Sequence, residues 1–109
     1  MAGQTREFFE ALAERGHEPR LEGATGTLRV DVEDQHQVEY WFLTVEEGDV
    51  TVSRGDAEAD AVIRTDRKLF ERMVAGEINP VAAFQRGSIV PRGNIGLILA
   101  FQRVFQTSP

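Results

Sequence analysis

Few side chains in this sequence have both the type and the setting that covalent chemistry needs. There is no cysteine among the 109 residues, so a disulfide, a thiolate metal site and a cysteine nucleophile are impossible. The two histidines lie in polar segments, His17 directly after a glycine and His36 within residues 34–37. Asp34 and His36 would supply only two ligands of a metal site. We therefore interpret both histidines as solvated loop residues.

Hydroxyl and glycine patterns also fail to indicate an enzyme. Ser53, Ser88 and Ser108 lie outside any Gly-x-Ser-x-Gly turn that would activate a serine. The glycines near the C-terminus are not followed by the lysine of a phosphate-binding loop. We expect no catalytic residue, no bound metal and no cofactor. The weakest alternative is a pocket enzyme in which Tyr40, His17 or a carboxylate acts as acid or base on an apolar metabolite.

Length and composition predict a single domain spanning residues 1–109. Hydrophobic residues make up 41% of the chain and charged residues 28%, which are ordinary proportions for a folded protein. The formal net charge is −6, whereas a nucleic-acid-binding protein needs a cationic surface, so we expect no nucleic-acid partner. The N-terminal segment lacks the features of a signal peptide, and no apolar run approaches the ~20 residues that cross a bilayer. We therefore expect a cytoplasmic protein.

The elements that must position any site can be read from the period of the apolar residues. Strands are predicted at residues 28–33, 38–45, 50–54, 60–65 and 88–92. Helices are predicted from a Thr5 cap to about residue 15, from an Asp66 cap to about residue 75, from an Asn79 cap to Phe84, and from an Asn94 cap to about residue 105.

Two of these strands indicate how the sheet is arranged. Residues 38–45 are apolar on both faces, which predicts a central strand covered on both sides. Pro91 cannot donate a ladder hydrogen bond, which predicts that residues 88–92 form an edge strand. Taken with the helices that follow, the strands indicate an α+β fold. It consists of a five-stranded, mainly antiparallel sheet with helices packed on one face.

The last predicted helix carries more apolar residues than one buried face requires. Its core stripe covers an arc of ~160° and comprises Leu97, Ile98, Ala100, Phe101, Val104 and Phe105. Ile95 and Leu99 fall instead on the opposite, polar face, with Gln102. Either the start of the helix is buried on two sides or the two aliphatic residues are harmlessly exposed; alternatively, they line a ligand mouth, a membrane contact or a dimer seam. Periodicity alone favours the first interpretation.

Several short motifs follow one another between residues 59 and 105. They are ADAVI at 59–63, GEINP at 76–80, AF at 83–84 with a glycine at 87, GNIGL at 93–97 and FQRVF at 101–105. In this order and spacing they resemble the sterol carrier protein domain family. The family's hairpin is matched more loosely by YWFLTV at 40–45. The resemblance extends over essentially the whole chain.

This resemblance implies a tunnel for fatty acyl chains, sterols or similar molecules between the sheet and its helices. Because the family's C-terminal helix borders that tunnel, the resemblance implies that Ile95 and Leu99 line it. This reverses the preference, based on periodicity alone, for two aliphatic residues without a function. The cavity lining expected on this basis comprises Trp41, Leu43, Met73, Phe84, Ile95, Ile98, Leu99, Phe101 and Phe105. The family's lysine-rich fifth strand is replaced here by SIVPR at 88–92, which removes positive charge near the tunnel. The sequence therefore gives less reason to expect binding of anionic acyl-CoA or of acidic membranes, and neutral ligands remain open.

These observations favour a non-catalytic carrier. Its partner is an apolar small molecule such as a fatty acid or a sterol, and its contact with a membrane is at most transient. A structural alternative is a homodimer in which the apolar excess forms the subunit seam, with Val90, Ile95 and Leu99 as seam residues.

Overall fold

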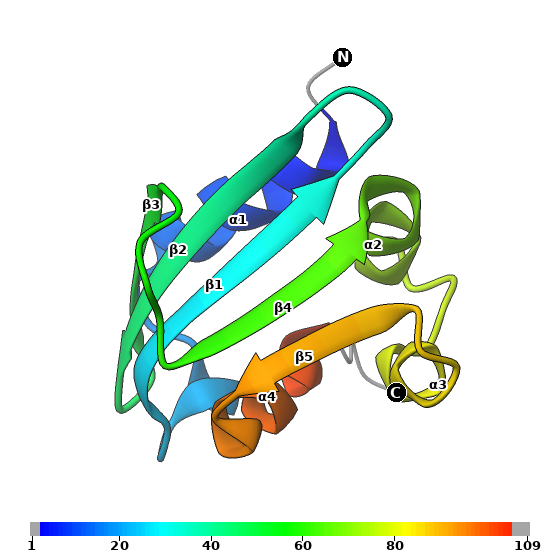
Figure 1. Ribbon diagram of the computed structural model, residues 1–109. Coiled ribbons are helices and arrows are strands. Elements are labelled where there is room, and N and C mark those ends of the chain that lie inside the picture. Colours follow the sequence, from blue (N-terminus) through cyan, green and yellow to red (C-terminus); the bar gives the residue numbers. More distant parts are fainter. Residues whose placement is uncertain (1–2, 106–109) are drawn as a thin grey trace.

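The computed structural model describes residues 3–105, which are built around one five-stranded sheet (Figure 1). The strands are β1 (Thr25–Glu33), β2 (Val38–Glu46), β3 (Asp49–Arg54), β4 (Ala61–Asp66) and β5 (Ile89–Gly93). The α-helices are α1 (Gln4–Arg15), α2 (Arg67–Val74), α3 (Pro80–Gln85) and α4 (Ile95–Gln102). Two 3-10 turns are η1 (Pro19–Leu21) and η2 (Arg103–Phe105). The strand order across the sheet is β3-β2-β1-β4-β5.

β1 is the central strand, and its two neighbours run in opposite directions. It pairs antiparallel with β2 and parallel with β4, whereas the pairs β2–β3 and β4–β5 are antiparallel. The sheet is therefore mixed and mainly antiparallel, and the predicted α+β fold class is confirmed. Pro91 lies on the edge strand β5, as its missing N–H predicted.

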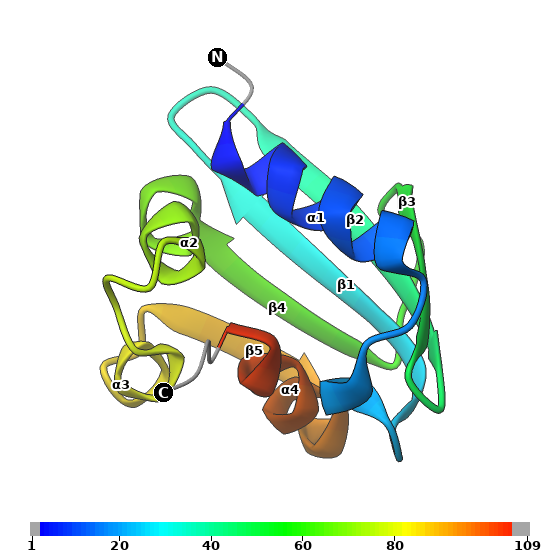
Figure 2. The same ribbon diagram turned by 180° about the vertical axis from the view of Figure 1, so that it is seen from behind.

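The helices gather on one side of the sheet and leave the other face bare (Figures 1 and 2). Leu28 and Val30 of β1 face the helices and are buried. The prediction that residues 38–45 form an internal strand is confirmed, since β2 lies between β1 and the edge strand β3. The predicted cover on both of its faces was wrong, since the helices pack on one face only. Its second apolar face, with Tyr40 and Phe42, is half-buried without a covering helix. Part of the cover comes from Arg29, whose guanidinium lies 5.5 Å from the Tyr40 ring centroid.

An ion pair occupies the bare face of β1. Arg29 donates two hydrogen bonds to Asp31, from Nε to Oδ1 at 2.8 Å and from Nη2 to Oδ2 at 3.0 Å. Asp31 is only 1% exposed. Arg29 Nη1 also donates to the backbone carbonyls of Asp56 and Ala57, at 3.0 and 3.2 Å. The loop before β4 and this ion pair therefore shield each other from solvent.

Three predicted helix caps are confirmed, and one was wrong. The side chain of each confirmed cap accepts a hydrogen bond from the first turn of its helix, at 2.9 Å for Asp66, 2.8 Å for Asn79 and 3.1 Å for Asn94. The first helix has Gly3 as its cap, and Thr5 lies inside its first turn. Local capping preference therefore identified the three later helix starts but misplaced the first.

Thr5 instead connects α1 to α2. Its side chain is buried, and its hydroxyl donates to Oε2 of Glu71 at 3.0 Å. The backbone N–H of Thr5 donates to the same carboxylate oxygen at 3.3 Å. Because the two residues are 66 positions apart in the chain, no local pattern could have indicated this contact.

The last helix is shorter than predicted. α4 ends at Gln102, and the chain tightens into the 3-10 turn η2 up to Phe105. No helix within residues 3–105 combines the length and the apolar character needed to cross a bilayer.

Candidate ligand-binding site

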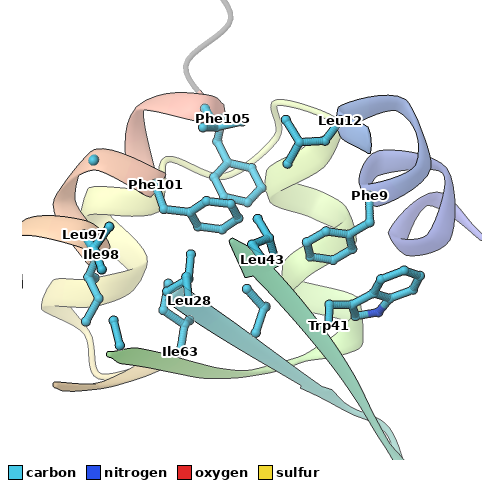
Figure 3. Packing of buried hydrophobic residues seen from close by; sticks show 14 of the residues in the cluster. Phe9, Leu12, Leu28, Trp41, Leu43, Ile63, Leu97, Ile98, Phe101 and Phe105 are labelled. Atoms are coloured by element: carbon cyan, nitrogen blue, oxygen red, sulfur yellow. The ribbon is translucent and has the colours of Figure 1, made fainter. Parts of the chain in front are cut away.

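Phenylalanine side chains from α1, α2, α4 and η2 meet above the sheet, and Figure 3 shows Phe9, Phe101 and Phe105 among them. Phe105 stacks on Phe8 with ring centroids 5.1 Å apart, and it meets Phe70 and Phe101 edge to face at 5.5 and 5.3 Å. Each such pair adds ~0.5–1.5 kcal/mol beyond the area it buries. Phe105 therefore fastens the C-terminal turn η2 to three helices.

A small pocket lies between the sheet and α2, α3 and α4. Its free volume is about 10 Å³, which is room for one water molecule at most. Nine of the eleven residues that line it are apolar. Those contributed by helices and by η2 are Phe70, Met73, Pro80, Phe84, Phe101 and Phe105. The structure therefore shows a closed interior.

Two uncharged polar side chains, Thr65 and Gln102, complete the pocket lining. Thr65 lies two positions after Ile63 on the inner face of β4 and is 3% exposed. Among residues 3–105, its Oγ1 has no hydrogen-bond partner. Gln102, at the end of α4, is 9% exposed. In the part of the chain that the structure describes, no charged side chain lines the pocket.

A much larger groove, with a volume of about 590 Å³, opens at the surface between α1 and the C-terminal turn. Its lining combines Phe8, Ala11, Val74, Val104 and Phe105 with Arg15, Glu18, Pro19 and Arg20. Phe105 is 8% exposed and lines both this groove and the interior pocket. Phe105 is therefore the residue common to the groove and the interior pocket, and we call it the partition between them.

The two cations of the groove are engaged in contacts of their own. Arg15 Nη2 donates to Oε1 of Glu18 at 3.0 Å, and Arg20 Nη1 donates to the carbonyl of Val104 at 2.8 Å. Glu18 is buried and also accepts the backbone N–H of Arg20 at 3.0 Å. This network ties η1 to η2 and so holds the Phe105 partition in place.

The predicted lining residues fall into three groups. Those that line the pocket are Met73, Phe84, Phe101 and Phe105. Those buried in the surrounding core, but outside the pocket lining, are Trp41, Leu43 and Ile98. Ile95 and Leu99 are 56% and 53% exposed on the outer side of α4. In this closed structure, the surface that carries Ile95 and Leu99 is thus separate from the interior pocket.

Sequence reasoning missed both polar members of the pocket. Thr65 follows Ile63 at the strand period of two, so its inward direction was readable, but its polarity did not suggest an interior position. Gln102 was placed on the polar face of the last helix, and that placement was wrong. Gln102 is buried and lines the same pocket as residues of α2 and α3.

The titratable candidates lie away from the pocket. His17 is held between two carboxylates, with Nδ1 2.7 Å from Asp49 Oδ1 and Nε2 2.7 Å from Glu22 Oε2. These hydrogen bonds, the one to Asp49 more than the one to Glu22, raise the pKa of His17 above its ordinary value of 6.5. Tyr40 lies on the bare face of the sheet. His17 therefore links the loop after α1 to the start of β3, whereas Tyr40 does not reach the pocket.

The turn between β1 and β2 is organised by Asp34. Its Oδ1 accepts the backbone N–H groups of His36 and Gln37 at 2.8 and 3.0 Å, and these hydrogen bonds lower the pKa of Asp34. His36 itself is exposed. Within residues 3–105, no three metal-ligating side chains come together.

A mixed five-stranded sheet, with helices on one side and an uncharged pocket between the two layers, matches the fold of solved sterol carrier protein structures. The model of the SCP-2 sterol transfer family matches residues 7–106. The chain belongs to this family, as its motifs suggested.

Several known proteins resemble this chain. Hydroxysteroid dehydrogenase-like protein 2 of Xenopus laevis is 26% identical over 105 residues, covering 94% of this chain but only 25% of that protein. The chain thus spans about a quarter of that relative's length. The apo sterol carrier protein 2 of Yarrowia lipolytica matches with a TM-score of 0.74 at 18% identity, over 91% of this chain and 87% of that one. Palmitated SCP2L2 of Aedes aegypti matches with a TM-score of 0.64 at 19% identity, over 88% and 92%.

Proposed function

We propose that this protein binds a long apolar molecule between its sheet and its helices, and carries or presents that molecule without a covalent step. The observation that carries the proposal is the uncharged, mainly apolar pocket, which shares the lining residue Phe105 with an open surface groove. Membership in the SCP-2 sterol transfer family and the palmitated state of the Aedes aegypti relative support the same class of ligand.

The small volume of the pocket fits an unloaded state. An empty cavity costs roughly 24 cal/mol per Å³, so a void of roughly 500 Å³ would cost ~12 kcal/mol, comparable to the whole stability of a domain. The helices are therefore expected to close over the sheet when no ligand is present. Binding must then separate the rings of Phe70, Phe101 and Phe105 and fill the space that opens.

A long chain supplies the free energy for this opening. Burying a sixteen-carbon chain releases ~13 kcal/mol, at roughly 0.8 kcal/mol per CH₂. Association costs about 4–15 kcal/mol in lost translational and rotational freedom. A short chain cannot offset that cost, so affinity is expected to rise with the length of the ligand.

The nine residues predicted to line the cavity have different places in this proposal. Contact with the ligand begins at those that already line the pocket, namely Met73, Phe84, Phe101 and Phe105. The pocket expands toward Trp41, Leu43 and Ile98. Ile95 and Leu99 reach a ligand only at a mouth beside α4.

Thermal unfolding with added butanol, octanol, dodecanol and hexadecanol tests the carrier function. We expect the Tm to rise with chain length and native mass spectrometry to show a bound long-chain alcohol. Val81→Ser is the matched control, because Val81 is 41% exposed on α3 and lines neither the pocket nor the groove, so this change is expected to leave the response unchanged. The carrier function is refuted if neither measurement detects binding at any chain length.

A second candidate function is self-association through the outer surface of α4. Ile95 and Leu99, one helical turn apart on α4, are both more than half exposed, and adjacent exposed aliphatic residues are typical of interfaces. Val90 of β5 is also more than half exposed, but it alternates with the inward-facing Ile89 and so lies on the sheet face without helices. Sedimentation over a range of protein concentrations tests this candidate. A dimer that dissociates on Leu99→Asp supports it, and a protein that stays monomeric at every concentration excludes it.

A further inference from the structure

Thr65 is the pocket residue that the apolar lining does not explain. It lies on the inner face of β4, paired in register with Val32 of β1 and Ile89 of β5. Its Oγ1 is buried and lacks a hydrogen-bond partner among the described residues. Thr5, which is equally buried, donates its hydroxyl to Glu71 at 3.0 Å. The fold is thus able to satisfy a buried threonine, and at Thr65 it does not.

An unsatisfied buried hydroxyl destabilises the empty protein, because it has lost its hydrogen bonds to water and gained none. Valine has nearly the same shape and would fill the same space without that loss. The other inward-facing residues of β4, Ala61 and Ile63, are apolar. A hydroxyl at position 65 is therefore explained by a partner that is present only in the loaded state.

The rest of the lining defines what this partner can be. Gln102 brings an amide group, which can both donate and accept hydrogen bonds. The cations Arg15 and Arg20 line the outer groove, on the far side of Phe105, and do not line the pocket. A carboxylate in the pocket would lose its hydration with no cation to replace it, which is strongly unfavourable. A neutral oxygen needs only the hydrogen bonds that Thr65 and Gln102 can form.

We propose that Thr65 and Gln102 form a polar subsite that binds the single neutral oxygen of a long apolar ligand, such as an alcohol or a ketone. This subsite rests on the proposed carrier function and narrows its ligand class to uncharged molecules with one buried oxygen. The Thr65 hydroxyl donates to a carbonyl oxygen or exchanges a hydrogen bond with an alcohol. The apolar body of the ligand lies among the phenylalanine rings that line the pocket.

Equilibrium dialysis of the full chain against dodecan-1-ol, dodecanoic acid and dodecane at pH 8 tests this subsite. At that pH the acid is ionised, so the three probes share a chain length and differ in polarity and charge. We expect the alcohol to bind at least about tenfold more tightly than the acid. Thr65→Val is expected to weaken alcohol binding about tenfold, the worth of one buried hydrogen bond, and to leave dodecane binding unchanged. Thr65→Ser, which keeps the hydroxyl, is expected to restore alcohol binding.

The outcomes separate the subsite from the carrier function. If the acid binds as tightly as the alcohol, or if Thr65→Val binds the alcohol with unchanged affinity, the subsite is wrong and the carrier function stands. If none of the three probes binds to the unaltered protein, the carrier function fails and the subsite fails with it. If Thr65→Val does not fold, Gln102→Met carries the same test, with weaker alcohol binding and unchanged dodecane binding as the supporting result.

Discussion

Replacing Thr65 by valine is expected to make the ligand-free protein more stable, although the residue is almost completely buried. Its hydroxyl has no partner in the described part of the chain, so its removal recovers the desolvation penalty of an unsatisfied polar group, about 1–3 kcal/mol. Valine keeps the branched shape that packs between Val32 and Ile89 of the neighbouring strands, so no cavity opposes the gain.

The gain is large enough to measure as a shift in Tm. The entropy of unfolding is about 2.1 cal/mol/K per residue, which for 109 residues gives ~0.23 kcal/mol/K. A stabilisation of about 1–3 kcal/mol therefore raises the Tm by ~4–13 °C. Differential scanning calorimetry measures this shift, on protein refolded from denaturant and shown by native mass spectrometry to hold no lipid.

Thr5→Val is the matched control, and it is expected to change the Tm in the opposite direction. The Thr5 hydroxyl donates to the Glu71 carboxylate at 3.0 Å, and losing a hydrogen bond to a charged group costs about 1.5–3 kcal/mol. A lower Tm for Thr65→Val would refute the expected gain, because the Thr65 hydroxyl must then have a partner in the folded protein. Equal losses in both variants would show that packing, and not hydrogen bonding, decides the effect.

The buried ion pair, the partition ring and the bridging histidine can each be tested by a single substitution. Arg29→Met leaves Asp31 buried without its cation and is expected to lower the free energy of unfolding by about 3–5 kcal/mol in urea titrations; a change below about 1 kcal/mol would contradict this. Phe105→Leu is expected to lower the free energy of unfolding by about 1–2 kcal/mol. The smaller side chain is also expected to speed the uptake of dodecan-1-ol in stopped-flow measurements, and an unchanged rate would indicate that the ligand enters elsewhere. His17 is expected to titrate above pH 6.5 in NMR spectra, because hydrogen bonds to two carboxylates raise its pKa. Its contribution to stability is therefore complete below about pH 6.5 and is lost as the pH rises through the folded-state pKa; Asp49→Asn is expected to move the midpoint back down.

The elements of the fold could be predicted because their signals are local. Asp66, Asn79 and Asn94 begin helices because each side chain accepts a backbone N–H of the following turn, within three residues of itself. Pro91 identified the edge strand because it lacks an N–H. The cover of β2 was predicted wrongly because a side chain from the neighbouring strand, Arg29, and not a helix, lies over Tyr40 on its outer face. Nothing in the sequence around Arg29 indicates that contact.

The pocket could be predicted only in part, because it depends on contacts between distant segments. The helical period predicted that Phe101 and Phe105 lie on the buried stripe of the last helix, and both line the pocket. Ile95 and Leu99 broke the same period, and the structure places both at the surface. Thr65 and Gln102 could not be recognised as a pair from the sequence, since only the packing of α2 and α4 on β4, with α3 against β5, brings both to one pocket.

The geometry favours opening of the pocket on its helical side. Each inward-facing residue of β1 and β4 is held by ladder pairing on both flanks, so the sheet cannot yield without breaking several backbone hydrogen bonds. The turn η2 has three residues and is held from outside by the hydrogen bond from Arg20 to the Val104 carbonyl. Moving η2 outward would carry Phe105 with it and join the groove to the pocket, while the sheet keeps its pairing. Breaking one hydrogen bond and separating a few aromatic pairs costs less than the free energy that a long apolar chain supplies, so the ligand itself can drive the opening that brings its oxygen to Thr65.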